Sequence, residues 1–551
     1  MNKQLVAIVA AQLLAVFIFI KDVHAVPFEG HKFLASAPSP YAVETATQIH
    51  KVGGNVVDAA VAMSLTLSVT TPYYAALGGG GFALIRSGNG PVEAVDFREV
   101  APAATGPDFY RDKSSQDGGA AVGVPGFPAG LWAMHKKYGR LPWKRLFDDA
   151  IRLADQGFQV SGEWVRNTTR NQKRFDANGT KYFFGKEQKP LIPGEILKQP
   201  QLGRALRLLR ARGEKGFYAG PVAADIAKSV TKSGGVVTVA DMAAYKVRWL
   251  KPMTAPLKGH TVYMMPPPSS SGVVTKTALG LIEKAELEKH KFLSVDELHM
   301  IGEILGRAFR GRALLGDPDF HKNPIDRLTS PEYIAELAKS IDLKKASVLK
   351  PASPDELEES SETTHYSVMD AQGNAVALTV TLNGNYGSGV VSEKFGIALN
   401  NEMDDFTTKL GEGNMYGLVQ GEGNKVEPGK RPLSSMSPTL VEKDGAIVMA
   451  AGAPGGPRII SAVLQVVYRT IVNGLDVDTA VQAPRVHHQV LPNVLYVDQN
   501  RLSPDVLEAL RKRGHTVEES WLAKVYAIKK NAAGWLEGAH DSRGEGATGG
   551  Y

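Results

Sequence analysis

The chain has 551 residues, of which 43% are hydrophobic and 22% charged, a composition typical of a globular protein with a large core. The net charge is only +6, and no dense Lys/Arg block with interleaved aromatic residues occurs, which argues against a nucleic-acid partner. The absence of cysteine excludes disulfides, thiolate zinc sites and a thiol nucleophile.

The first residues have the layout of a signal peptide. Lys3 precedes an apolar run from about Leu5 to Ile20, and Val23 with Ala25 forms a small-residue cleavage site. The run is shorter than the ~20 apolar residues of a spanning helix, although an uncleaved membrane anchor is the alternative. We therefore expect residues 1–25 to be a signal peptide. The protein is then exported, periplasmic or secreted, without stable membrane insertion.

The segments that follow have the patterns of buried helices and strands. The Ala-rich residues 53–69 predict a buried helix that ends before Pro72 and a glycine run. Residues 82–86 and 92–97 have the apolar pattern of two strands joined by a turn. Helical patterns dominate residues 130–211, and they return around "AADIAKSV" and "SVDELHMIGEILGRAFRGRALL".

The character of the chain changes near residue 363. Residues 343–362 are rich in Pro, Ser, Lys and Glu, as expected for an exposed segment. "HYSVMDAQGNAVALTVTLN" predicts a hairpin, and "TLVEKDGAIVMAAGAPGG" predicts a second one that leads into a helix over residues 458–472. Residues 515–520 and 525–530 add strands. Such a succession predicts a layered α/β or α+β fold, but periodicity does not order the strands.

Several common site motifs are absent from the sequence. It contains no phosphate loop of the P-loop type, no His-Glu-x-x-His helix and no Gly-x-Ser-x-Gly elbow. The adjacent His487 and His488 point two imidazoles in different directions, which favours a structural role. The run Gly78 to Gly81 lacks the spacing of a dinucleotide loop, so close backbone packing is the preferred interpretation.

Thr363 and Thr364 follow the acidic stretch and open a strand-like alternation. If the Glu362–Thr363 bond is cut, Thr363 gains a free α-amino group with a reference pKa of about 7.7–8.0 beside its own hydroxyl. That amine can accept the hydroxyl proton as the oxygen attacks a carbonyl. The alternative is a threonine whose β-branch merely suits the start of a strand.

A wider set of motifs resembles the γ-glutamyltranspeptidases over nearly the whole mature chain. Downstream these are "TTHYSVMD", "TLNGNYGSG", "NNEMDDF", "KRPLSSMSPT", "GAPGGPRII" and "PRVHHQ". Upstream they are "GGNVVDAAVAM", "LGGGGFAL", "VDFREVAP", "GVPGFPAG", "KGFYAG", "PPPSSSG" and "LGDPDF". The resemblance implies an α+β fold, the αββα sandwich of N-terminal nucleophile hydrolases, with two stacked sheets flanked by helices. It also implies self-cleavage into a large chain (26–362) and a small chain (363–551) that remain together as a heterodimer.

The same resemblance implies the catalytic groups. Thr363 matches the nucleophile, and Thr381 matches the threonine that orients and activates it. Gly455 and Gly456 lie between a predicted strand and a predicted helix. Their N–H groups would hold the developing oxyanion.

A γ-glutamyl donor carries an α-ammonium and an α-carboxylate, so its pocket needs acidic and basic groups. By resemblance, Asp405 pairs with the ammonium, aided by Asn383 and Glu402. Arg98 clamps the carboxylate, with hydroxyl donors from Ser434 and Ser435. Tyr416 lies in the glycine-rich residues 409–424, which resemble a lid over the donor site.

The implied reaction is a two-step acyl transfer from glutathione or a related γ-glutamyl compound, through a threonine ester, to water or to an amino acid or dipeptide. It needs no metal or organic cofactor. Two alternatives stay open. One is a glutaryl or cephalosporin acylase of the same superfamily, against which Asp405 argues because such donors lack the α-ammonium. The other is a non-catalytic exported binding protein.

Overall fold

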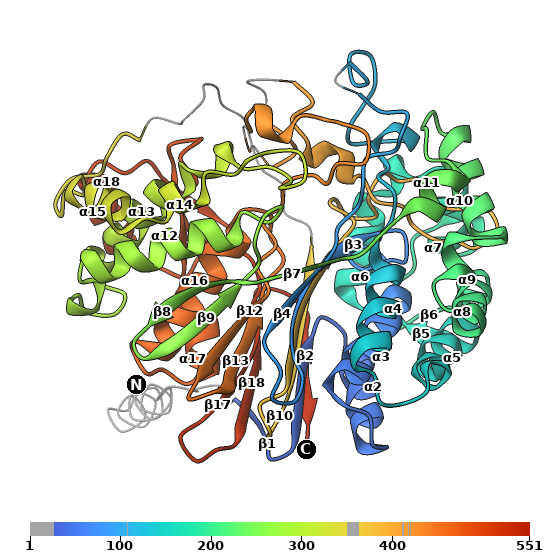
Figure 1. Ribbon diagram of the computed structural model, residues 1–551, viewed down its shortest axis with the longest axis horizontal. Helices are drawn as coiled ribbons and strands as arrows, with labels where there is room; N and C mark the ends of the chain where they lie inside the picture. The colour runs from blue at the N-terminus through green and yellow to red at the C-terminus, as the bar shows by residue number, and fades with distance from the viewer. Residues whose placement is uncertain (1–26, 107, 350–362, 410–412, 417, 419) are drawn as a thin grey trace, which may run out of the picture.

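Two central sheets lie face to face between two groups of helices (Figure 1). The computed structural model describes residues 27–106, 108–349, 363–409, 413–416, 418 and 420–551. The predicted signal peptide and the last part of the predicted acidic segment, including Glu362, lie outside the described residues.

Each central sheet has seven strands, and every pair of neighbours is antiparallel. The first sheet runs in the order β19 (Ala547–Gly550), β2 (Phe33–Ala37), β10 (Thr364–Asp370), β11 (Ala375–Thr381), β3 (Gly80–Arg86), β4 (Glu93–Phe97) and β7 (Arg248–Leu250). The second runs β1 (Phe28–Gly30), β18 (Leu536–His540), β17 (Tyr526–Lys530), β13 (Ala446–Gly452), β12 (Thr439–Lys443), β9 (His260–Met264) and β8 (Met253–Leu257). Smaller sheets join β14 (Val486–His487), β15 (Leu495–Asp498) and β16 (Val517–Ser520), and β5 (Phe158–Gln159) with β6 (Ile196–Leu197).

The inner strands of the first sheet are buried on both faces, whereas its edge strands β19 and β7 are half-buried. Successive side chains of a strand point to opposite sides of the sheet. In β3, Phe82 and Leu84 join the core between the sheets, whereas Ala83 and Ile85 join the core beneath the helices. Every residue of β10 and β11 is buried. The central strands that carry the predicted nucleophile are therefore held rigidly from two sides.

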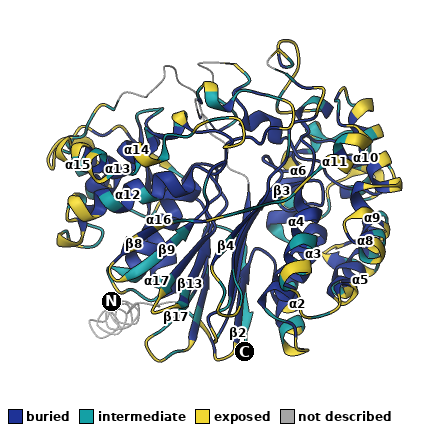
Figure 2. Cartoon of the chain, viewed as in Figure 1, coloured by how far each residue is buried: buried dark blue, intermediate teal, exposed yellow. Residues whose placement is uncertain are grey.

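Helices cover the outer face of each sheet, and their own outer faces are exposed (Figure 2). The first sheet is covered by α2 (Pro40–Lys51), α3 (Val56–Thr70), α4 (Phe127–Tyr138), α5 (Asp148–Gln156), α6 (Gly162–Arg170), α7 (Ala177–Phe183), α8 (Pro200–Arg212), α9 (Lys215–Tyr218), α10 (Pro221–Lys232) and α11 (Val239–Ala244). The second side holds α12 (Ser271–Lys284), α13 (Val295–Phe309), α14 (Ile325–Leu328), α15 (Pro331–Lys339), α16 (Arg458–Ile471), α17 (Val477–Gln482) and α18 (Pro504–Lys512). Of these helices and the rest of the described chain, none is both long and apolar enough to cross a membrane.

The elements expected from the sequence are confirmed where the pattern was periodic. The buried helix is α3, whose residues are all buried, and the two predicted hairpins are β10–β11 and β12–β13. The strands that were not predicted are two to five residues long, too short for a clear alternation. They are β1, β2, β5, β6, β7, β8, β9, β14, β15, β18 and β19. The predicted αββα sandwich is thus confirmed.

Candidate active site

The register of the β10–β11 hairpin brings the two predicted catalytic threonines together. Thr364 pairs with Val380, so Thr363, one residue earlier, lies opposite Thr381 at the end of β11. Their hydroxyl oxygens are 3.4 Å apart, and both residues are buried. The Thr381 hydroxyl also accepts a hydrogen bond from the Asn383 N–H at 2.8 Å. This contact orients the Thr381 side chain, and either threonine hydroxyl can be the donor of the contact between them.

A buried guanidinium, that of Arg98, lies beside the threonine pair at the end of β4. Its Nη1 contacts Glu402, and its Nη2 donates to Asp405 Oδ2 at 2.5 Å. Arg98 is 1% exposed, and its Nε donates to the carbonyl of Pro432 at 3.3 Å. The acidic and basic groups predicted for the two charges of the donor therefore lie in direct contact.

Burial changes the protonation of the carboxyl groups around Arg98. It raises the pKa of Glu99 to about 8. It also raises the pKa of Glu402 and Asp405, while the Arg98 charge acts in the opposite direction on all three. Glu99 Oε2 lies 3.9 Å from Arg98 Nη1, and neither Glu99 oxygen has a hydrogen-bond partner in the described part of the chain. Near neutral pH the cluster thus carries fewer than three negative charges.

The predicted oxyanion glycines lie at the start of α16. Gly455 and Gly456 have φ values of +134° and +55°, a region that favours glycine. Their carbonyls accept from the N–H groups of Arg458 and Ile459, whereas their own N–H groups donate to nothing within the described residues. Two free N–H donors beside a helix N-terminus can stabilise a developing negative charge.

The predicted lid residue, Tyr416, closes one side of the site. Its hydroxyl donates to the carbonyl of Asn383 at 2.7 Å. Asn414, two residues earlier, donates from Nδ2 to Asp405 Oδ1 at 2.8 Å. Within the predicted lid, residues 410–412, 417 and 419 lie outside the described residues, so the mobility of this segment stays a prediction.

All the predicted site residues except Gly455 line one pocket. The lining consists of Arg98, Arg312, Thr363, Thr381, Asn383, Glu402, Asp405, Tyr416, Leu418, Ser434, Ser435, Met436, Gly456 and Ile459. The sequence interpretation missed Arg312, Leu418, Met436 and Ile459. Nothing distinguishes Arg312 in "GRAFRGRALLG" from the neighbouring arginines, and apolar lining residues resemble core residues in any sequence.

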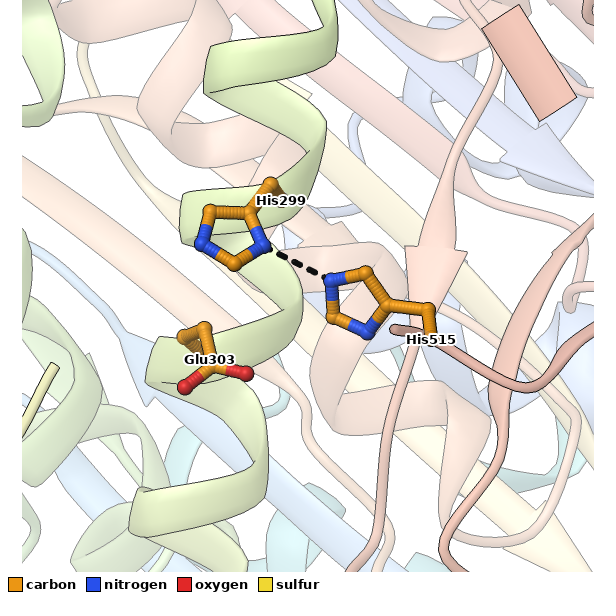
Figure 3. Close-up of side chains that lie close together, drawn as sticks. All are labelled: His299, Glu303 and His515. Carbon is orange, nitrogen blue, oxygen red and sulfur yellow. Dashed lines mark hydrogen bonds between the residues drawn. The ribbon is translucent and has the colours of Figure 1, made fainter. Parts of the chain in front are cut away.

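A separate cluster of His299, Glu303 and His515 has side chains that can bind metals (Figure 3). His299 Nδ1 and His515 Nε2 are 2.8 Å apart, the distance of a hydrogen bond. Two nitrogens on a tetrahedral zinc ion would lie about 3.3 Å apart. Glu303 already accepts from Arg307 at 2.7 Å and from the Ser347 N–H at 3.0 Å. The two histidines are therefore hydrogen-bonded to each other, whereas Glu303 is bonded to Arg307 and Ser347.

Comparison with known proteins agrees with this geometry. The sequence model of the family described as Gamma-glutamyltranspeptidase matches residues 42–551. A glutathione hydrolase proenzyme of Escherichia coli (strain K12) is 41% identical over 539 residues, which cover 95% of this chain and 93% of the relative. One from Pseudomonas aeruginosa is 40% identical over 529 residues, which cover 93% of each chain.

Solved structures also resemble the chain. A cephalosporin acylase from Bacillus halodurans superposes with a TM-score of 0.85 at 24% identity and covers 97% of this chain and 98% of its own. A Helicobacter pylori gamma-glutamyltranspeptidase structure matches with a TM-score of 0.55 at 34% identity and covers 60% of this chain and 97% of its own. The stacked sheets, with a buried threonine leading into a central strand, define the class of N-terminal nucleophile hydrolases. Within that class, the chain belongs to the gamma-glutamyltranspeptidase family.

Proposed function

We propose that the protein is a self-processing γ-glutamyltransferase and glutathione hydrolase. The observation that carries this proposal is the Thr363–Thr381 pair, which lines the same pocket as the Arg98–Asp405 ion pair. A hydroxyl nucleophile beside buried charges of both signs suits a donor that is an amide and also an α-amino acid. The bacterial relatives described above, which are named glutathione hydrolase proenzymes, support the same assignment.

The precursor would cut itself between Glu362 and Thr363, leaving a large chain (26–362) and a small chain (363–551) in one heterodimer. The relatives named glutathione hydrolase proenzymes support a processed precursor. The leader and export to the periplasm or the cell exterior belong to the same proposal.

The chemistry then follows from the residues of the pocket. The new α-amino group of Thr363 accepts the hydroxyl proton as Oγ1 attacks the γ-amide carbonyl, with Thr381 orienting the hydroxyl. The N–H groups of Gly455 and Gly456 hold the oxyanion, and the cysteinylglycine amine leaves with the proton. Water or the amine of an amino acid or dipeptide then attacks the γ-glutamyl ester and regenerates Thr363. No step needs a metal or an organic cofactor.

Recognition of the donor would use the groups around Arg98. Asp405, with Glu402 and Asn383, faces the α-ammonium. Arg98 and the hydroxyls of Ser434 and Ser435 face the α-carboxylate. Tyr416 covers the bound donor.

An acylase acting on glutaryl or cephalosporin side chains is the alternative, and the likeness to the cephalosporin acylase extends to the fold. Those side chains lack an α-ammonium, whereas Asp405 and Glu402 provide an acidic subsite. A side-by-side assay of a γ-glutamyl anilide and a glutaryl anilide decides between the two. A preference for the glutaryl compound would overturn our assignment. A non-catalytic binding protein would cleave neither donor.

Self-processing is tested by substituting each of the two neighbouring threonines. Purified wild type should run as two bands on a denaturing gel, and Thr363→Ala as one inactive precursor. Thr364→Val is the matched control, because Thr364 is buried and its hydroxyl has no partner among the described residues. It should still be cleaved and active. A wild type that is active as a single band would contradict the mechanism.

A further inference from the structure

Arg312 is a buried guanidinium in the pocket to which the proposed chemistry gives no role. It begins a single turn, Arg312–Leu314, after α13, and it is 4% exposed. Its Nε donates to Ser435 Oγ and its Nη1 to Gln420 Oε1, both at 3.3 Å. Both acceptors are neutral, and both hydrogen bonds are long for a charged donor.

The charge of Arg312 lacks an ionic partner among the described residues. Arg98, in the same pocket, pairs with Glu402 and Asp405, but Arg312 forms no ion pair with any described carboxylate. Its Nη2 has no hydrogen-bond acceptor in the same part of the chain. Burial lowers the pKa of Arg312 to about 10, with Arg98 adding to the effect and Asp405 opposing it. A buried cation without a counter-ion is costly, and an anionic ligand would remove that cost.

The neighbours of Arg312 complete a site for a carboxylate. Because the Ser435 oxygen accepts from Arg312 Nε, the Ser435 hydroxyl hydrogen can point to a ligand in the pocket. The Ser434 oxygen likewise accepts from the Met436 N–H at 3.1 Å, so the Ser434 hydroxyl hydrogen can also point to a ligand. A guanidinium with two adjacent hydroxyl donors matches the planar, two-oxygen geometry of a carboxylate.

We propose that Arg312 binds the α-carboxylate of the γ-glutamyl donor, as a second guanidinium beside Arg98. The inference rests on the proposed function. The two arginines then have different roles. Arg98 holds Glu402 and Asp405 in place for the α-ammonium and neutralises them, so its charge is largely compensated before the donor binds. Arg312 supplies a positive charge that no described carboxylate contacts directly, and this charge attracts the carboxylate of the donor.

The test uses two donors that differ only at the α-carbon: a γ-glutamyl anilide with a free α-carboxylate and the same anilide with an α-carboxamide. On the carboxylate donor, Arg312→Gln should lower kcat/KM about 10- to 100-fold, mainly through KM, because a hydrogen-bonded charge pair is lost. On the carboxamide donor the loss should be less than about threefold, because a neutral group gains little from a cation. Arg312→Lys should recover part of the loss, because it keeps the charge but not the planar fork.

Arg310→Gln is the matched control, since Arg310 lies two residues earlier and is partly exposed outside the pocket. It should leave both donors unaffected. An equal loss on both donors in Arg312→Gln would mean a structural role and would overturn the inference, while the proposed function would stand on wild-type activity. If Arg312→Gln does not process itself, the ratio of the two donors in Arg312→Lys decides in the same way. A processed wild type that cleaves neither donor would overturn the proposed function and the inference together.

Discussion

Gly456 is the residue of the pocket at which one added methyl group should be most harmful. A Cβ there would lie 2.7 Å from Tyr416 Cδ1, and the backbone has a φ of +55°. Gly456→Ala should therefore displace Tyr416 or the oxyanion N–H and lower kcat at least ~10-fold. Steady-state kinetics with a γ-glutamyl anilide measures the loss.

Gly445, at the tip of the β12–β13 hairpin, is the control for Gly456. It has a φ of +81°, but a Cβ there would meet nothing within 4 Å. Gly445→Ala shares the backbone strain without the contact and should retain kcat. Equal losses in the two variants would show that strain, not the contact with Tyr416, is responsible.

His365 predicts a pH dependence of stability. It is fully buried between the hydroxyls of Thr379 and Ser367, and burial lowers its pKa from 6.5 to about 3. Between these two values the unfolded chain binds a proton that the folded chain does not, so stability is lost as the pH falls below 6.5. Between pH of about 7.5 and 5, this one group should remove about 2 kcal/mol.

The contribution of His365 is isolated by comparing His365→Gln with its parent, both in the uncut Thr363→Ala precursor. Denaturant unfolding at each pH should show a shallower decline in the His365→Gln chain, because glutamine does not titrate. Identical pH slopes in the two precursors would contradict the predicted role. Glu99, whose pKa is raised to about 8, is present in both chains, so its opposite contribution cancels in the difference.

Individual site residues differ in how far the sequence could predict them. The residue pattern predicted the hairpin and offered Thr363 as a candidate nucleophile, but Thr381 came from the family resemblance. The register of the folded hairpin places the two threonines opposite each other. Arg98, Asp405 and Ser435 came only from the family resemblance. Arg312 could not be found, because its place in the pocket depends on how the turn after α13 meets the chain near Ser435.

At the scale of the single element, helix α3 is stabilised by its N-terminal cap. Asn55 caps this buried helix, and Asp58 accepts from the N–H groups of Asn55, Arg140 and Leu141 at 3.0–3.1 Å. Asp58→Ala would leave these partly buried donors unpaired. The free energy of unfolding should fall by about 2–4 kcal/mol. Urea unfolding of the Thr363→Ala precursor, with and without this change, measures it.

Asp241 offers a matched control for Asp58, because it forms the same capping box at the start of the short helix α11. Its contacts are more exposed, so Asp241→Ala should cost only ~0.5–1 kcal/mol. A comparable loss at both positions would show that the burial of α3 adds nothing to the cost.

At the scale of the whole molecule, both central sheets combine strands from the two sides of the proposed cut. In the first sheet β10 pairs with β2, and β11 pairs with β3. In the second, β1 pairs with β18, and β12 pairs with β9. Cutting after residue 362 therefore leaves every one of these hydrogen-bonded pairs intact.

The two chains of the processed protein should thus elute as one species in size exclusion and separate only in denaturant. The segment 363–551 expressed alone should fail to give a cooperative unfolding transition, because β10 and β11 would each lose a pairing strand. Dissociation of the processed chains in native buffer would contradict this account of the fold.

The sequence alone determined the periodic parts of this protein: the buried helix α3, the two hairpins and the helix after the glycine pair. These features follow from the local spacing of hydrophobic residues and from turn-forming residues, both of which depend only on neighbouring positions in the sequence. Only the tertiary structure decided the strand order, the contact of Arg98 with Glu402 and Asp405, and the unpaired charge of Arg312 in the same pocket. Those features depend on segments more than 100 residues apart, and burial sets their energies only after the two sheets have stacked.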